Sequence, residues 1–327
     1  MTNNLAPIGV STYGRLQHLQ RTITALQKNT LAQESELFVF SDAPRLGDED
    51  RVAAVRKYLR KIDGFKEVHV IERTENSRVV NNRGGMRMLL DQFGKMIFLE
   101  EDVVTAPGFL SFMNQALTTY RNNDKVFAIT GYCPPIDARK YISSDAFLLQ
   151  TCNFWGFAIW KERYDQVSMQ TPSCEVFKTI LNPFSLASYM RIGSDMPHLF
   201  LLDAQGIIDA GDIKFAFEMW KKGSYLLIPT FSLSMSIGLD GTGVHCGMER
   251  KYDTEMSSDV SGRFKLPREP ELNNALVAKY RDFRSEGRTY NWLKLIYIQL
   301  IRFSRFKLRQ KLVAMRTTMK AKLGCIF

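Results

Sequence analysis

The chain has 327 residues, 45% of them hydrophobic and 12% aromatic, which excludes a disordered protein and allows one large domain or two small ones. Five cysteines are scattered without a C-x-x-C pair, so neither a disulfide framework nor a thiolate zinc site is indicated. Of the net charge of +10, residues 291–327 contribute nine Lys or Arg and no acid, so the rest carries +1 and is not expected to bind nucleic acid.

The first 132 residues alternate between apolar runs and amphipathic segments. "PIGVST" at 7–12 predicts a strand, and Leu16, Leu19, Ile23 and Leu26 at helical spacing predict a helix over 13–29. The same patterns predict further strands at 36–44, 66–74, 95–104 and 125–132, helices at 48–62, 85–94 and 107–123, and a polar turn at 75–84. No basic and apolar leader with a cleavage site precedes the first strand, so we expect a cytoplasmic body.

This alternation indicates an α/β fold with a mostly parallel central sheet and helices on both faces. Beyond about residue 135 it fails. Residues 141–165 predict an extended piece, a Trp/Gly turn and a helix start, 171–205 a helical insertion, and 224–247 strand material with a Gly-rich loop. We expect one domain in two halves, 1–135 and 136–265, followed by a C-terminal helical tail at 266–327.

Three adjacent acids, Glu100, Glu101 and Asp102, follow the apolar run "MIFL". Ligands of open parallel sheets bind outside the carboxyl ends of the strands, where these acids are expected. If strand geometry persists, Glu100 and Asp102 point to one face and Glu101 to the other. The alternative is a solvated strand end favoured by the next helix, but Thr105 is the better N-cap of that helix. Because adjacent carboxylates need a compensating cation or donors, the triplet favours a metal or substrate site.

The segment "FLEEDVVTAPGFLSF" resembles a signature of nucleotide-sugar glycosyltransferases of the GT-A fold. It is most similar to bacterial polysaccharide-type transferases related to the N-acetylglucosaminyltransferase I family, except that Glu101 stands where that family has Asp. The resemblance implies a GT-A type, Rossmann-like sheet. It also implies that Asp102 binds a Mn²⁺ or Mg²⁺ ion bridging the donor's pyrophosphate, while Glu100 and Glu101 approach the ribose and the sugar.

Two segments before the triplet extend the resemblance. "STYGR" resembles the family's first strand-turn, where Thr12, Tyr13 and Arg15 would approach the nucleotide base. "VFSD" places Asp42 at the family's usual nucleotide contact, although Asp42 would equally cap the turn "SDAP".

Two segments after the triplet also match. "NFWGFAIW" resembles the loop that faces the donor sugar, here with Trp155, Gly156 and Phe157; core or lid aromatics are the alternative for the two rings. "IPTFSLSMSIGLDGTGVHC" resembles the closing segment, in which Thr242 and Gly243 would fold over the pyrophosphate. His245 would touch phosphate or metal, although a lone histidine is more often structural.

Inverting glycosyl transfer needs a base for the acceptor hydroxyl. The resemblance implies that this base is an acid shortly before the strand that leads to the closing segment, where "IIDAGDIKFAFEMW" offers Asp209 and Asp212. The spacing to Pro229 favours Asp212, which would equally cap a helix. The sequence thus predicts a metal-dependent hexosyl- or N-acetylhexosaminyltransferase of polysaccharide biosynthesis, using a nucleotide diphosphate sugar, with UDP-sugars favoured, and a saccharide or lipid-linked acceptor. The alternatives are a non-catalytic saccharide- or membrane-binding protein on the same scaffold, a sugar-phosphate nucleotidyltransferase and, third, a nucleic-acid binder through the basic C-terminal tail.

The C-terminal segment combines an apolar run, 292–301, with basic residues interleaved with aromatic ones. The run is shorter than the roughly 20 residues that span a bilayer, so we interpret it as an interfacial helix on an anionic membrane surface. The protein would then be peripheral on the inner face of the cell membrane. A helix docked on the body is the alternative.

Overall fold

The computed structural model describes residues 5–151, 153–170, 173–242, 250–258 and 262–285. The chain divides into two compact units, one formed by Met1–Val167 with Glu218–Tyr280 and the other by Ser168–Phe217 with Arg281–Phe327. Within the described ranges, we find no helix with the length and hydrophobicity needed to cross a bilayer. The predicted interfacial segment at 292–301 lies outside those ranges.

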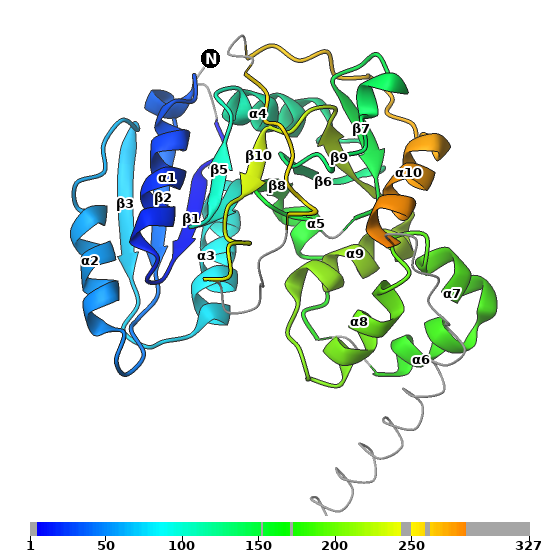
Figure 1. The fold of residues 1–327 in the computed structure, drawn as a ribbon, viewed down its shortest axis with the longest axis horizontal. Helices are drawn as coiled ribbons and strands as arrows, with labels where there is room; N and C mark the ends of the chain where they lie inside the picture. The colour runs from blue at the N-terminus through cyan, green and yellow to red at the C-terminus, as the bar shows by residue number, and fades with distance from the viewer. Residues whose placement is uncertain (1–4, 152, 171–172, 243–249, 259–261, 286–327) are drawn as a thin grey trace, which may run out of the picture. The chain divides into compact units, whose positions relative to one another are not determined.

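The larger unit is built on an eight-stranded sheet in the order β3-β2-β1-β4-β8-β6-β9-β7 (Figure 1). The strands are β1 (Ile8–Thr12), β2 (Glu36–Ser41), β3 (Glu67–Glu72), β4 (Lys95–Glu100), β6 (Val126–Thr130), β7 (Ala146–Leu149), β8 (Phe157–Trp160) and β9 (Tyr225–Pro229). Strands β1 to β4 are parallel and β9 is parallel to β6, whereas β8 and β7 run antiparallel to their neighbours. A second, two-stranded sheet pairs β5 (Val103–Thr105) with β10 (Ser234–Ser236).

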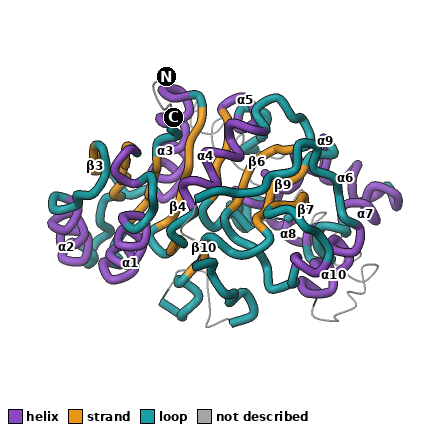
Figure 2. The backbone as a smooth tube through the Cα atoms, turned by 90° about the horizontal axis from the view of Figure 1, so that it is seen from above, coloured by secondary structure: helices purple, strands orange, loops and turns teal. Residues whose placement is uncertain are grey.

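Helices cover both faces of this sheet. They are α1 (Leu16–Gln27), α2 (Glu49–Leu59), α3 (Arg78–Phe93), α4 (Phe109–Thr119) and α5 (Lys161–Tyr164), with 3-10 turns at Ala32–Glu34 and Ala138–Lys140. Figure 2 shows α1 and α2 on one side of the strands and α3 on the other. Ile8 and Val10 of β1 belong to the core cluster that includes Leu19 and Ile23 of α1, while the intervening Gly9 faces α3. The predicted α/β class with a mostly parallel sheet is confirmed.

Two local predictions were wrong. Helix α3 begins within the predicted polar turn, because the Ser77 side chain accepts a hydrogen bond from the Val80 N–H at 3.3 Å and starts the helix early. Thr105 does not cap the following helix, whose N-cap is Gly108. Instead, Thr105 pairs with Ser234 in the small sheet, and its hydroxyl accepts a hydrogen bond from Asn29 at 3.1 Å.

The smaller unit is helical. It contains α6 (Ser173–Leu181), α7 (Pro183–Tyr189), α8 (Met196–Ala204) and the first part of α9 (Gly211–Lys222), and the last residues of α10 (Asn274–Ser285) also belong to it. Its centre is aromatic: the ring of Phe200 stacks on Phe217 with centroids 4.1 Å apart, and Tyr189 meets both rings edge-on. The predicted helical insertion at 171–205 corresponds to most of this unit.

Gly9 provides a test of sheet packing. The sheet register pairs it with Phe38 of β2 and Phe98 of β4, and an added Cβ would lie 2.6 Å from a ring carbon of Phe98 and 2.8 Å from Leu89. We expect Gly9→Ala to lower the free energy of unfolding by about 1–3 kcal/mol through overpacking, measured by urea denaturation. The control is Gly211→Ala, where a Cβ meets nothing within 4 Å. Equal stability of the two variants would contradict this account.

Candidate active site

The acid triplet lies at the carboxyl end of β4, in the turn that leads to β5. Glu100 is the last residue of β4, and Glu101 and Asp102 form the turn. Because β1 runs parallel beside β4, with Ser11 opposite Glu100, the turn that follows β1 reaches the same edge of the sheet. Glu101 and Asp102 therefore meet that turn, where Thr12, Tyr13 and Arg15 are predicted from the sequence to belong to the same site.

Glu101 holds the two turns together. Its Oε2 accepts hydrogen bonds from the Thr12 hydroxyl at 2.6 Å and the Tyr13 N–H at 2.7 Å, and its Oε1 accepts one from Nε of Arg15 at 2.8 Å. The hydroxyl of Thr22 on α1 donates to the Glu101 carbonyl at 2.8 Å. Glu101 is buried, and both of its carboxylate oxygens are engaged by donors.

Asp102 shares the Arg15 guanidinium with Glu101. Nη2 of Arg15 lies 2.6 Å from Oδ2 of Asp102, so one arginine bridges two carboxylates. Loss of water alone would lower the pKa of Arg15, but the charges of Asp102 and Glu101 outweigh this effect and raise the pKa above its ordinary value. The expectation that Glu101 faces away from Asp102 was therefore wrong, because the chain leaves strand geometry after Glu100.

A glycine allows the chain to close against Asp102. The N–H of Ile237 donates to the Asp102 carbonyl at 2.7 Å, which brings Gly238 beside the carboxylate. A Cβ on Gly238 would lie 1.9 Å from Oδ2 of Asp102 and 3.0 Å from Nη1 of Arg15. Only a residue without a side chain fits there.

Glu100 has a different environment from the other two acids. It accepts a hydrogen bond from Asn82 of α3 at 3.1 Å and does not pair with Arg15. Loss of water around its carboxyl group, and then the charge of Asp102, raise the pKa of Glu100 to about 7. The residue keeps an exposed surface, so solvent screens part of the neighbouring charge.

The two remaining residues predicted for the nucleotide end both organise loops. Tyr13 donates its hydroxyl to Asp48 at 2.7 Å and accepts the Arg45 N–H at 2.9 Å. Asp42 is buried, and its Oδ1 accepts the N–H groups of Ala43 and Ser77 at 2.9 and 3.0 Å, so it joins two loops. Its own N–H donates to the Thr12 carbonyl at 3.0 Å, so Asp42 lies at the same sheet edge.

The loop that contains Trp155, Gly156 and Phe157 has one half-buried aromatic ring and one ring in the core. Trp155 meets Tyr132 and Tyr252 edge-on, with centroids 4.6 and 5.4 Å away. Gly156 has a φ of 69°, a conformation that favours glycine. Phe157 is 6% exposed and packs beside Phe98 within the sheet, so the core interpretation holds for Phe157, while Trp155 keeps a partly exposed ring.

The described part of the closing segment is tied to α1. Both the N–H and the hydroxyl of Thr242 donate to Oδ1 of Asp240, at 3.0 and 2.6 Å, and His18 lies 3.1 Å from Oδ2. The Thr242 hydroxyl is the main cause that lowers the pKa of Asp240 to about 2. Sequence reasoning missed His18, which had no motif around it. Gly243 and His245 lie outside the described residues.

The two candidate bases lie near the start of α9. Asp209 pairs with Lys214 at 2.6 Å, and Lys214 also pairs with Asp203 at 2.9 Å. Asp212 is in the first turn of α9, and its carboxylate accepts the Ile213 N–H at 3.1 Å. Loss of water raises the pKa of Asp212, although its exposed surface limits the effect. Asp212 is therefore the more available base of the two.

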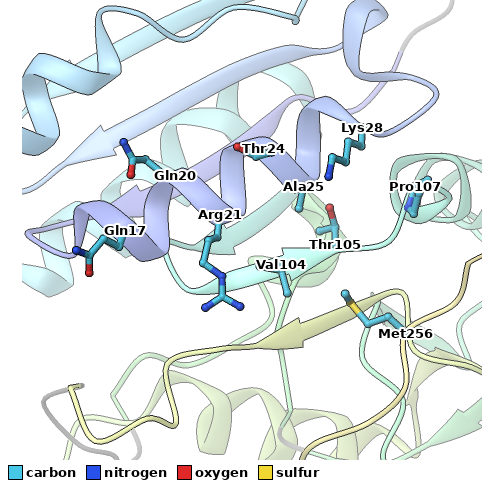
Figure 3. A pocket seen from close by; sticks show the side chains of 10 residues that line it. All are labelled: Gln17, Gln20, Arg21, Thr24, Ala25, Lys28, Val104, Thr105, Pro107 and Met256. Carbon is cyan, nitrogen blue, oxygen red and sulfur yellow. The ribbon is translucent and has the colours of Figure 1, made fainter.

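A cavity of about 600 Å³ lies between α1 and β5 (Figure 3). Its lining residues are Gln17, Gln20, Arg21, Thr24, Ala25, Lys28, Val104, Thr105, Pro107 and Met256. Sequence reasoning identified none of them as site residues, because the α1 contributors form the ordinary polar face of an amphipathic helix. The available signal was the pair Arg21 and Lys28, two helical turns apart on one face.

A divalent cation at the acid triplet would depend on Asp102 alone, whose Oδ2 already pairs with Arg15. Both oxygens of Glu101 already accept hydrogen bonds, and Glu100 pairs with Asn82. Mg²⁺ or Mn²⁺ held by one or two carboxylates takes its remaining ligands from water and substrate phosphates. Within the described ranges, Glu36, Glu67 and His69 form the one group of three possible ligands close together, at the opposite end of the strands, with Lys66 paired to Glu36 at 2.8 Å.

Comparisons with known proteins give distant likenesses only. No family model and no curated protein matches the chain. A mannosyltransferase from Pyrobaculum calidifontis, solved with GDP-Man and Mn²⁺, is 14% identical with a TM-score of 0.34 over 48% of this chain and 44% of that one. S. aureus TarS is 12% identical with a TM-score of 0.39 over 72% and 37%. GalNAc-T7, solved with UDP, GalNAc and Mn²⁺, is 11% identical with a TM-score of 0.39 over 69% and 42%.

In each of these three cases the chain spans less than half of the compared structure's own length.

The raised pKa of Glu100 predicts a pH-dependent stability. Its folded-state pKa of about 7 exceeds the ordinary 4.5, so the folded protein holds the Glu100 proton more tightly than the unfolded chain does. The folded state is therefore fully stable with respect to this group below pH 4.5, and it loses stability as pH rises through 7. We expect Glu100→Gln to melt about 2–4 °C above the wild type at pH 8 and close to it at pH 4.5. Thermal denaturation at both pH values measures this, with the exposed Glu271→Gln as control. A gain that did not change with pH would contradict the shift.

Proposed function

We propose that this chain is a metal-dependent, inverting glycosyltransferase that moves a sugar from a nucleotide diphosphate sugar to a saccharide or lipid-linked saccharide. The observation that carries the proposal is the meeting of the β1 turn and the acid triplet at the carboxyl edge of the sheet, through Arg15, Glu101 and Asp102. The ordered resemblance of five sequence segments to GT-A transferases supports it, and the α/β sheet is the type that such a resemblance implies.

In this proposal the donor is bound by residues at the carboxyl ends of β1 and β2. Thr12, Tyr13 and Asp42 surround the nucleotide, and Arg15 lies towards its charged end. Glu101 acts on the donor mainly by fixing the β1 turn, since its carboxylate is occupied by Thr12, Tyr13 and Arg15. Glu100, which is free of the Arg15 ion pair, faces the ribose or sugar.

The reaction needs charge neutralisation on the leaving group and a proton acceptor for the acceptor hydroxyl. A bound Mn²⁺ or Mg²⁺ would stabilise the departing nucleoside diphosphate, and Asp102 is the residue that would hold it. As the base for the proton of the acceptor hydroxyl we propose Asp212, a residue of the smaller unit. The half-buried Trp155 offers a ring face to the donor sugar, and Phe157 contributes to the loop from the core, where it packs beside Phe98. Thr242, Gly243 and His245 would close over the diphosphate.

Donor binding tests the substrate class. With a panel of nucleotide sugars, we expect one nucleotide to raise the melting temperature more strongly with Mn²⁺ than without it, because a ligand of the folded state stabilises it by about 2.7 kcal/mol at 100 times its Kd. Stabilisation by a sugar phosphate and a nucleoside triphosphate instead would indicate a nucleotidyltransferase. Stabilisation without any transfer or hydrolysis would indicate a non-catalytic binding protein.

Two substitutions test the assigned roles. We expect Asp102→Asn and Asp212→Asn each to lower kcat/KM by about 10²–10⁴, the range of lost charge stabilisation and lost general base catalysis. The control is Asp124→Asn, an acid whose side chain is 96% exposed. Circular dichroism verifies the fold of each variant. Turnover retained in either variant would remove the role assigned to that residue.

A further inference from the structure

The side chain that contacts the proposed metal ligand is a cation of the protein itself. Arg15 lies 2.8 Å from Glu101 and 2.6 Å from Asp102, and the side chains of the three residues are only 18%, 7% and 13% exposed. A charge pair removed from water to this degree is retained until another partner replaces it. Asp102 therefore already has a cationic partner, which it shares with Glu101.

This arrangement opposes the binding of a divalent cation on its own. A cation that approached Asp102 would compete with the guanidinium for the same carboxylate and would lie beside a fixed positive charge. It would gain few protein ligands in return, because both oxygens of Glu101 are occupied by donors from the β1 turn and Arg15. The protein alone supplies too little to displace the arginine.

A nucleoside diphosphate changes this balance in two ways. Its phosphate oxygens bring the ligands that the metal lacks, and they give the guanidinium an alternative anion with matching bidentate geometry. Arg15 also carries an unused donor: its Nη1 is buried and makes no hydrogen bond in the part of the chain that the structure describes. A buried N–H without an acceptor is costly, and a phosphate oxygen would satisfy it once the chain at Gly238, which lies beside Nη1, moves aside.

We propose that Arg15 is a positioning residue that holds Asp102 in the absence of donor and releases it to the metal only when a nucleoside diphosphate arrives, so that metal and nucleotide bind cooperatively. This inference rests on the proposed function for the identity of the nucleotide. The ion pair between Arg15 and Asp102 involves the protein alone, so its effect on Mn²⁺ affinity can be measured without nucleotide.

Mn²⁺ binding to the full chain tests directly whether Arg15 keeps Asp102 from the metal. The amplitude of the free Mn²⁺ signal in electron paramagnetic resonance reports binding without any turnover. We expect the wild type without nucleotide to bind Mn²⁺ at least ten times more weakly than Arg15→Gln, in which Asp102 is released. Arg15→Lys keeps the charge but cannot bridge two carboxylates, so its affinity should lie between the two.

The matched control is Arg121→Gln, which removes the same charge from an arginine whose side chain is 64% exposed. It should bind Mn²⁺ as the wild type does. Equal Mn²⁺ affinity of wild type and Arg15→Gln, whether tight or weak, would overturn the proposal. If Arg15→Gln does not fold, as judged by circular dichroism, Arg15→Lys provides the same comparison.

A second arm measures the coupling. With saturating UDP or GDP, we expect the wild type to bind Mn²⁺ at least ten times more tightly than without it, and Arg15→Gln to show a much smaller ratio, since the coupling is reciprocal between the two ligands. An equal ratio in both proteins would overturn the role of Arg15. If neither nucleotide binds at all, the proposed function fails, but the nucleotide-free comparison still decides whether Arg15 holds Asp102.

Discussion

The bridge formed by the Arg15 guanidinium between Glu101 and Asp102 is the interaction on which the candidate site depends. Three charged groups with little exposure must compensate one another, because none of them tolerates loss of water alone. The bridge joins the turn after β1 to the turn after β4, and the hydroxyl of Thr22 attaches α1 to the same point. Two parallel neighbouring strands are what bring these turns together.

The first half of the fold could be predicted because its sequence signals are local. Apolar runs of strand length alternate with helices of clear periodicity, and β1, β2, β3, β4 and β6 all lie within predicted strands. The errors came from competing partners that a linear pattern does not show. Thr105 has a side chain suited to helix capping, but it lies in β5 and pairs with Ser234 of β10, more than a hundred positions away in the sequence.

The nearness of the acids to "STYGR" is consistent with the sequence prediction that both belong to one site, since both follow buried parallel strands. That this site binds a donor stays a prediction. The contacts between these side chains were not predicted. The sequence prediction assigns Arg15 to the nucleotide base and Asp102 to the metal ion, whereas the two side chains pair with each other. A positive residue and several acids at the ends of neighbouring strands are a signal of pairing that could have been used. The antiparallel β8, inserted between β4 and β6, had no comparable signal.

The length of the Glu101 side chain has a consequence for the evolution of this site. Its carboxylate reaches the Tyr13 N–H, the Thr12 hydroxyl and Arg15 at once. Aspartate is shorter by one methylene, about 1.5 Å, and would not span the same gap without a shift of the backbone. Positions 12, 15 and 101 should therefore covary: relatives with aspartate at 101 are expected to differ at 12 or 15. An alignment in which the three positions vary independently would argue against this.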